Sequence, residues 1–141
     1  MYRVQKYKIS YVRETGTPVE PRLIKHRKDV EEFAQKQLAE HPIEGVIIVA
    51  LDNRNKITGY TRTEGTINQC AVYPREVFSF LMSCGAASFV IAHNHPGGSL
   101  WPSEPDWALT EKLQQGGKCL DIPLHDHIIV SEVGSYSLRV S

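Results

Sequence analysis

The chain has 141 residues, a length typical of one domain, and 41% of them are hydrophobic, as in ordinary globular proteins. Sixteen basic and sixteen acidic side chains give a net charge of zero, which argues against a dedicated duplex-DNA-binding protein, since such proteins carry a basic excess. Three cysteines without C-x-x-C spacing argue against a disulfide framework, and no apolar run reaches the roughly 20 residues of a membrane helix, so we expect a cytoplasmic protein without a membrane partner.

The first forty residues predict one strand and one helix, within about residues 2–41. Hydrophobic and polar side chains alternate at 7–11, a period of two that is typical of a strand with one buried face. Hydrophobic side chains then recur at helical spacing from about Asp29 to Glu40, and Pro42 ends this helix. We expect Asp29 to be the N-cap, because a short acidic side chain can accept hydrogen bonds from the first free amides.

The middle of the chain predicts two central strands, a hairpin and a helix. The run GVIIVALD at 45–52 is hydrophobic almost throughout, as in a strand covered on both faces, and residues 57–63 predict its antiparallel partner. A helix follows between Pro74, at a favoured first-turn position, and Gly85, which ends it. The run ASFVIAH, which ends at residue 93, predicts a second buried strand.

The last third of the chain predicts one helix and a closing hairpin. The helix begins at Ser103 and has a glycine stop at Gly116, and the strands at 125–130 and 135–140 form the hairpin. Strands and helices therefore alternate, with hairpins among them. We expect a single α/β domain over residues 1–141, with its core at about 44–137 and helices on both faces of a mixed sheet.

Polar side chains cluster where the second buried strand ends and the last helix begins. His93 and His95 are two apart, so in an extended chain both imidazoles point to the same side. Two glycines at 97–98 allow the chain to fold sharply after them. Ser103 and Asp106 are three apart across the helix start, so both can turn back toward the strand end.

Two imidazoles and one carboxylate at this place predict a catalytic zinc site. His93, His95 and Asp106 would leave a fourth coordination position open for water, whereas a structural zinc is enclosed by four protein ligands. The pattern of Ser103 and Asp106 is also that of a capping box, in which both side chains only satisfy helix amides. The two roles are compatible, because a cap fixes where Asp106 points.

Glu44 is the candidate proton acceptor of such a site. Zinc lowers the pKa of a bound water to about 7, and a nearby carboxylate can then take the proton and pass it to the leaving group. Glu44 directly precedes the first central strand, so we expect it at an edge of the sheet. A solvated glutamate is the alternative interpretation of this position.

The order Glu…His-x-His-x7-Ser-x2-Asp resembles the JAMM motif of JAB/MPN-type metalloproteases. The stretches YPREVF, AHNHPGG, PSEPD and DHIIV are similar to those of the RadC branch of this superfamily. The resemblance covers about residues 44–137. It implies a three-layer α/β fold of the cytidine-deaminase-like kind, in which helices flank a mixed β-sheet.

The resemblance also implies a function and residue roles. It implies zinc-dependent hydrolysis of an amide or isopeptide bond in a peptide or protein, with His93, His95 and Asp106 as the ligands of one zinc ion. Glu44 would be the general base, and Ser103 would donate a hydrogen bond to the developing oxyanion or to the metal-bound water.

Two other functions stay open at this point. RadC relatives carry a DNA-repair label, so the chain could be a nucleic-acid-associated module, although the first forty residues do not resemble the helix-hairpin-helix region of full RadC proteins. Many MPN domains lack the metal set and act as inactive scaffolds through protein contacts. The oligomeric state is not predicted.

A second His-x-His, formed by His125 and His127, lies on the predicted C-terminal hairpin. No Ser/Asp helix start accompanies it, so direct zinc binding is the weaker interpretation. Asp126 or His127 is a candidate for supporting a zinc ligand by hydrogen bonding, and a structural segment is the alternative. Two tryptophans flank the candidate site. We expect Trp107 to pack beneath its helix, while Trp101 is a candidate for lining a substrate groove.

Overall fold

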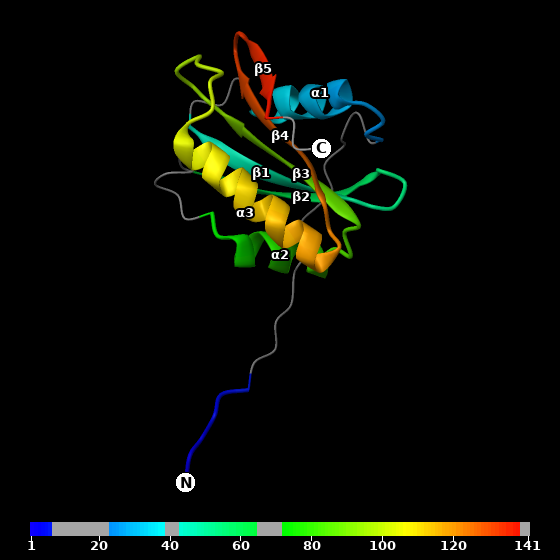
Figure 1. The fold of residues 1–141 in the computed structure, drawn as a ribbon, viewed down its shortest axis with the longest axis vertical. Helices are drawn as coiled ribbons and strands as arrows, with labels where there is room; N and C mark the ends of the chain where they lie inside the picture. The colour runs from blue at the N-terminus through cyan, green and yellow to red at the C-terminus, as the bar shows by residue number, and fades with distance from the viewer. Residues whose placement is uncertain (7–22, 39–42, 65–71, 139–141) are drawn as a thin grey trace.

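One mixed β-sheet of five strands, in the order β2-β1-β3-β4-β5, forms the centre of the described protein (Figure 1). The structure, a computed structural model, describes residues 1–6, 23–38, 43–64 and 72–138. The strands are β1 (Gly45–Leu51), β2 (Ile57–Glu64), β3 (Ser88–Asn94), β4 (Leu124–Ser131) and β5 (Gly134–Ser137). Only the β3–β4 pair is parallel, and the other three pairs are antiparallel.

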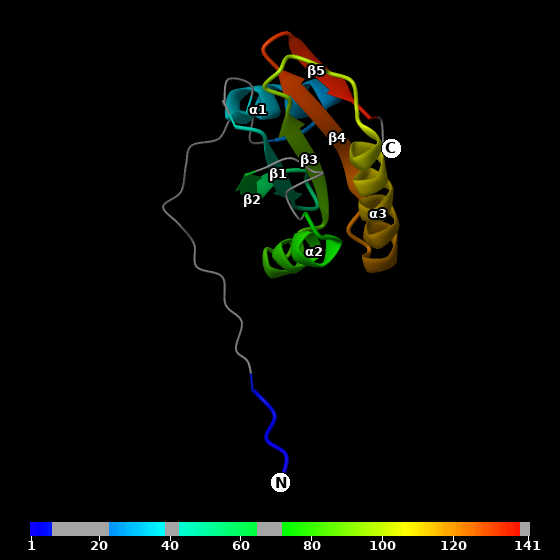
Figure 2. The same cartoon turned by 90° about the vertical axis from the view of Figure 1, so that its left-hand side faces the viewer.

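Helices cover both faces of the sheet, so the fold has three layers (Figure 2). Helix α1 (Arg27–Leu38) packs on one face, chiefly against β4 and β3. Helices α2 (Pro74–Ser83) and α3 (Glu104–Leu120) pack on the other face. The predicted α/β fold, a mixed sheet flanked by helices, is confirmed. No helix within the described ranges is both long enough and apolar enough to cross a membrane.

The sequence of β1 explains why the sheet is covered twice. All seven residues of this strand are buried, and successive side chains of a strand point to opposite faces. Ile47, Val49 and Leu51 join the hydrophobic cluster of α1, whereas Val46 and Ile48 join the cluster of α2 and α3. The uninterrupted apolar run that predicted a central strand thus contributes side chains to two hydrophobic clusters, one on each face of the sheet.

The same alternation determines which way the polar ends of β3 and β4 face. Val90 and Ala92 of β3 belong to the α1 cluster, so His93 points to the opposite face, toward α3. Ile128 and Val130 of β4 also belong to the α1 cluster, so His127 points to the α3 face as well. Two histidines from adjacent parallel strands therefore lie beneath one helix.

The helix boundaries differ from prediction at two places. Helix α1 begins at Arg27, and Asp29 lies inside its first turn, where its carboxylate accepts hydrogen bonds from the backbone amides of Lys25 and His26. The prediction that Asp29 is the N-cap is therefore wrong, because the side chain caps amides that precede it. The predicted strand at 7–11 and the predicted end of this helix at 40–42 lie outside the described residues.

Helix α3 continues past the predicted stop at Gly116 and ends after Leu120, where Asp121 adopts the left-handed conformation. The glycines serve close packing instead. A Cβ at Gly116 would lie 2.7 Å from the Phe78 ring, and one at Gly117 would lie 2.5 Å from the backbone oxygen of Ile122. Such contacts are too short for a Cβ atom, so close packing explains why glycine stands at both positions.

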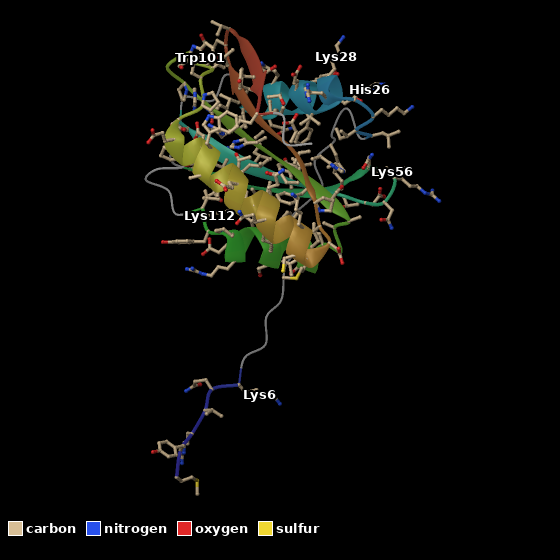
Figure 3. The ribbon with its side chains drawn as sticks, viewed as in Figure 1. Lys6, His26, Lys28, Lys56, Trp101 and Lys112 are labelled. Carbon is tan, nitrogen blue, oxygen red and sulfur yellow. The ribbon has the colours of Figure 1, made fainter. Side chains whose placement is uncertain are left out.

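The two tryptophans beside the predicted site are both exposed. The prediction that Trp107 packs beneath its helix is wrong, since 46% of its surface is accessible. The buried residues of α3 are Asp106, Leu109, Thr110, Leu113 and Gly117. Trp101 is 77% exposed and lies at the end of the molecule near the β4–β5 turn (Figure 3). Its ring centroid is 6.0 Å from that of Tyr136.

Candidate metal centre

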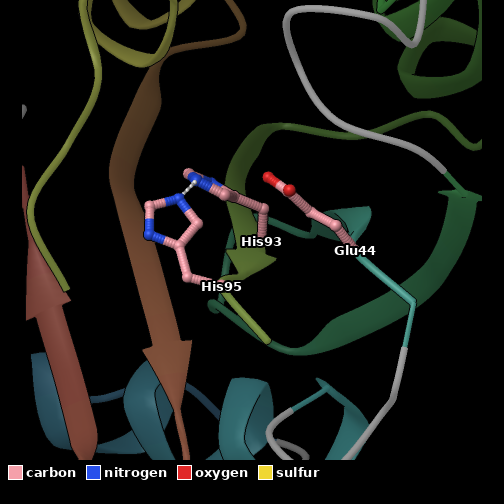
Figure 4. A group of neighbouring side chains, drawn as sticks. All are labelled: Glu44, His93 and His95. Carbon is pink, nitrogen blue, oxygen red and sulfur yellow. Dashed lines mark hydrogen bonds between the residues drawn. The ribbon is translucent and has the colours of Figure 1, made fainter. Parts of the chain in front are cut away.

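His93 and His95 meet at the end of β3. His93 is completely buried, and its Nε2 atom lies 2.9 Å from the Nε2 atom of His95. The chain then turns at Gly98, which has a φ of 89°, a value that glycine adopts without strain. Figure 4 shows the two rings joined by this contact, with the Glu44 side chain directed toward them.

Asp106 reaches the same point from the first turn of α3. Its Oδ2 atom lies 3.4 Å from His93 Nε2 and 3.6 Å from His95 Nε2. The same oxygen accepts a hydrogen bond of 2.8 Å from the backbone amide of Ser103. Because β3 and β4 are parallel, the crossover through α3 starts beside the end of β3, and this topology brings the carboxylate to the histidines.

The three donor atoms fit a zinc ion. Zinc–nitrogen and zinc–oxygen bonds are about 2.0–2.1 Å long, so neighbouring donors of a tetrahedral site are about 3.3 Å apart. The separations here are 2.9, 3.4 and 3.6 Å, which a shift of a few tenths of an ångström would equalise. Two neutral imidazoles and a carboxylate are also donor types that zinc prefers.

The hydrogen bond made by His95 Nδ1 determines the protonation of His95 Nε2. His95 Nδ1 lies 2.9 Å from the backbone oxygen of Ser99. A carbonyl oxygen only accepts, so Nδ1 carries the proton and donates it. In the neutral ring, Nε2 then holds a lone pair directed at the point where the three donors meet.

Glu44 lies beside the two histidines. One carboxylate oxygen of Glu44 and one ring nitrogen each of His93 and His95 lie within 4.8 Å of one another, so these three residues form a group that could hold a metal ion. Partial burial raises the pKa of Glu44, while the charges of His93 and His95 lower it. A raised pKa makes a carboxylate a stronger base, which favours its uptake of a proton.

Asn94 holds the backbone on both sides of Glu44. This buried side chain accepts a hydrogen bond of 2.7 Å from the Gly45 amide and donates one of 3.1 Å to the Ile43 carbonyl. Arg62 also donates to the Ile43 carbonyl, and its guanidinium covers Gly45 so closely that a Cβ would lie 2.5 Å from Nη2. The position of Glu44 is therefore set by its neighbours on three strands.

Ser103 forms the capping box that its sequence pattern predicted. Its Oγ atom accepts a hydrogen bond of 3.1 Å from the Asp106 amide, while the Asp106 carboxylate accepts one from the Ser103 amide. The hydroxyl acts as an acceptor in this contact, so its proton is left to donate elsewhere. Ser103 is exposed, in contrast to Asp106.

The electrostatics of the centre favour a charged carboxylate. Burial alone would raise the pKa of Asp106, but the nearby imidazoles of His93 and His95 outweigh it and hold the pKa far below its usual range. The contact with the Asp106 carboxylate also raises the pKa of His95, against the effect of burial. Asp106 therefore carries a negative charge at any physiological pH, as a metal ligand must.

Of the residues in the second His-x-His, only His127 contacts the centre. Its Nε2 atom lies 2.7 Å from His93 Nδ1, and its Nδ1 atom lies 2.5 Å from Thr110 Oγ1. The Asp126 carboxylate lies on the α1 side of the sheet, where it accepts hydrogen bonds from Arg27 and Ser137. His125 lines a depression beside α1.

The sequence interpretation missed two residues of the centre, Asn94 and Thr110. Asn94 stands between the two predicted ligands, but nothing in the sequence indicates that it pairs with the backbone around Glu44. Thr110 follows Asp106 by four residues and so lies on the same helix face, which was a usable signal.

The chain was also compared with known proteins. A family model described as the RadC-like JAB domain matches residues 24–141. A UPF0758 protein of Saccharophagus degradans is 38% identical over 109 residues, which cover 77% of this chain and 49% of that protein. A UPF0758 protein of Actinobacillus pleuropneumoniae is 41% identical over 106 residues, covering 74% of this chain and 48% of that protein.

A third relative matches a longer part of the chain. The UPF0758 protein of Chlorobium phaeovibrioides is 33% identical over 133 residues, which cover 94% of this chain and 57% of the relative. The chain thus spans about half the length of these relatives. The match of the family model to most of the chain agrees with the fold and with the resemblance seen in the sequence, and the protein belongs to the RadC-like JAB domain family.

Proposed function

We propose that this protein is a zinc-dependent hydrolase of the JAMM type that cleaves an amide or isopeptide bond in a peptide or protein. The observation that carries the proposal is the convergence of His93 Nε2, His95 Nε2 and Asp106 Oδ2 within 3.6 Å, with the Glu44 carboxylate beside them. Three protein donors leave one coordination position for water or substrate, which is the arrangement of catalytic zinc.

A zinc ion bound there would polarise the scissile carbonyl and lower the pKa of a water molecule at the open position. The residues of the chain supply the proton transfers. Glu44 takes the proton of the attacking water and hands it to the nitrogen of the leaving amine, a step for which its raised pKa is suited. The leaving nitrogen must be protonated because an amide anion is too basic to depart.

Ser103 is suited to stabilise the negative charge that develops on the substrate oxygen. The amide oxygen gains negative charge when water adds to the carbonyl carbon, and a hydrogen-bond donor placed beside it stabilises that charge. The Ser103 hydroxyl uses its oxygen as an acceptor in the capping box and keeps its proton available. The side chain is exposed to solvent, and the capping box joins it to Asp106, a residue of the centre.

A metal measurement and a cleavage measurement together test the proposal. The protein is loaded with zinc, its metal content per chain is measured by mass spectrometry, and it is incubated with a proteome-derived peptide library and with isopeptide-linked peptides. We expect one zinc per chain, loss of that zinc in His95→Ala, and new peptide termini with the wild-type protein. In Glu44→Gln the zinc stays and cleavage falls by about 10²- to 10⁴-fold, the usual contribution of a general base.

Glu104→Gln is the matched control, because Glu104 is an exposed glutamate in the first turn of the helix that carries Asp106. This variant keeps both zinc and cleavage. A zinc-loaded wild-type protein that cleaves neither library contradicts the hydrolase function. Cleavage that survives Glu44→Gln at the wild-type rate contradicts the assigned base.

A further inference from the structure

His127 lies directly behind His93, on the side away from the metal centre. Its ring is completely buried, and its Nε2 atom contacts Nδ1 of His93, the ring nitrogen that does not face Asp106. The contact of 2.7 Å is a hydrogen bond, so one of the two nitrogens carries a proton and the other a lone pair. Which nitrogen has the proton decides whether His93 Nε2 is free to bind a metal.

The hydrogen bonds beyond His127 settle the direction of the proton. Thr110 Oγ1 donates to the backbone carbonyl of Asp106 over 2.8 Å, and this uses the only proton of the hydroxyl. Thr110 Oγ1 must then accept from His127 Nδ1. A neutral His127 with its proton on Nδ1 has a lone pair on Nε2, so His93 Nδ1 is the donor.

We propose that His127 and Thr110 are positioning residues that hold His93 in the Nδ1–H tautomer and so keep its Nε2 lone pair directed at the metal. The proposal rests on the metal-binding part of the proposed function. These hydrogen bonds run from His93 through His127 and Thr110 to the backbone carbonyl of Asp106. They therefore also connect two of the three ligands to each other, through β4 and α3.

His95 supports this interpretation by contrast. A single backbone carbonyl, that of Ser99, fixes its tautomer. His93 is deep in the sheet, where its Nδ1 atom faces the neighbouring strand, and a side chain of β4 takes the place of the carbonyl. Both ligands thus present Nε2 to the same point by pairing Nδ1 with an acceptor.

Zinc affinity tests the proposal with matched variants. His127→Gln keeps an acceptor oxygen near the place of Nε2, whereas His127→Met removes it and keeps a side chain of similar length. We expect zinc affinity, measured by competition with a chromophoric chelator, to fall about 10- to 100-fold in His127→Met, the usual effect of losing a ligand's hydrogen-bond partner, and to stay within a few-fold in His127→Gln.

Thr110 gives an independent pair of variants. Thr110→Val keeps the shape and removes the hydroxyl, so affinity falls in the same direction, while Thr110→Ser restores it. In the His127→Met background, Thr110→Val has no further effect on zinc affinity, because the hydrogen bond between Thr110 and His127 is already lost. Asp126→Asn is the control: the Asp126 carboxylate faces Arg27 and Ser137, and the side-chain oxygen of asparagine can still accept from the His127 backbone amide, so we expect unchanged affinity. Equal zinc affinity in His127→Met and wild type overturns the proposal.

A spectroscopic measurement distinguishes positioning from a merely structural role. Long-range ¹⁵N–¹H correlation spectra of the wild-type protein report which nitrogen of His93 carries the proton. We expect the Nδ1–H form, with His127 also protonated on Nδ1, both with and without zinc. A His93 ring protonated on Nε2 in the metal-free protein contradicts the proposal. Because this spectrum needs no metal, it decides the matter even if the wild-type protein binds no zinc and the proposed function fails.

Discussion

Ser103 and Asp106 hold each other across the start of α3, and the carboxylate oxygen that caps the helix is also the one that faces the histidines. Asp106 Oδ2 accepts from the Ser103 amide and lies 3.4 Å from His93 Nε2. The capping and metal interpretations of this motif are therefore not alternatives. The helix cap uses one lone pair of the oxygen and leaves another for the candidate metal centre.

Ser103→Ala separates these two roles. It removes the hydroxyl that accepts from the Asp106 amide, so we expect the free energy of unfolding to fall by about 1 kcal/mol, as for other N-cap substitutions. Zinc stoichiometry stays at one, because the Ser103 backbone amide still holds the carboxylate. Urea unfolding and metal analysis check both parts, and loss of zinc in this variant would show that the hydroxyl is needed for ligation.

Asn94→Ala tests how Glu44 is held. The substitution removes both hydrogen bonds to the backbone around Glu44 and leaves the buried Gly45 amide without this acceptor. We expect a loss of about 1–3 kcal/mol in the free energy of unfolding, the cost of an unsatisfied buried group. Under the proposed function, cleavage falls while zinc stays bound, because none of the three ligand side chains is changed. Unchanged stability and unchanged cleavage would contradict this role of Asn94.

The pH dependence of stability reports on His127. Burial holds the pKa of His127 in the folded, metal-free protein well below 6.5. As the pH falls through about 6.5, His127 therefore binds a proton in the unfolded chain but not in the folded protein. This contribution is complete above pH 6.5 and is lost as the pH falls below it. His95 acts in the opposite sense, since its pKa is raised by Asp106, and its contribution is lost as the pH rises.

Comparison of wild type with His127→Gln isolates the buried histidine. Between pH 7.5 and pH 5.5 we expect the wild-type free energy of unfolding, measured with urea, to fall by about 1 kcal/mol more than that of His127→Gln. The histidines remote from His127 are common to both proteins and cancel in the difference. Parallel pH profiles for the two proteins would mean that His127 titrates normally in the folded state.

Gly117→Ala tests the close approach inside α3. Alanine favours a helix over glycine by about 1 kcal/mol, but overpacking costs about 1–3 kcal/mol, and here the new Cβ would meet a backbone oxygen that cannot move aside easily. We expect net destabilisation in urea unfolding. Gln115→Ala, at an exposed position of the same helix, changes stability by less than about 0.5 kcal/mol. A more stable Gly117→Ala protein would refute this packing argument.

The sequence predicted the elements whose patterns are local. The buried run of β1, the Pro74 start of α2 and the spacing of His93 and His95 each follow from periodicity or backbone geometry. The strand alternation placed both imidazoles on one side, and the capping pattern placed Asp106 in a first helical turn. These local rules were enough to nominate the three candidate ligands.

Features that depend on tertiary packing were not predictable in the same way. The sequence predicts a helix stop at Gly116, but the helix continues, and the glycine is explained by the Phe78 ring that packs against it. Asn94 and His127 act through strands that are distant in sequence, so their partners could not be read from spacing. Asp29 illustrates a smaller error, because the amides that it caps lie before the helix and not within it.

Anomalous X-ray diffraction at the zinc edge, from crystals of the zinc-loaded protein, locates a bound zinc ion. We expect one anomalous peak about 2.0–2.1 Å from His93 Nε2, His95 Nε2 and a carboxylate oxygen of Asp106, with a non-protein ligand at the fourth position. Zinc-loaded crystals without a peak at this point, or with zinc bound only elsewhere, would contradict this prediction.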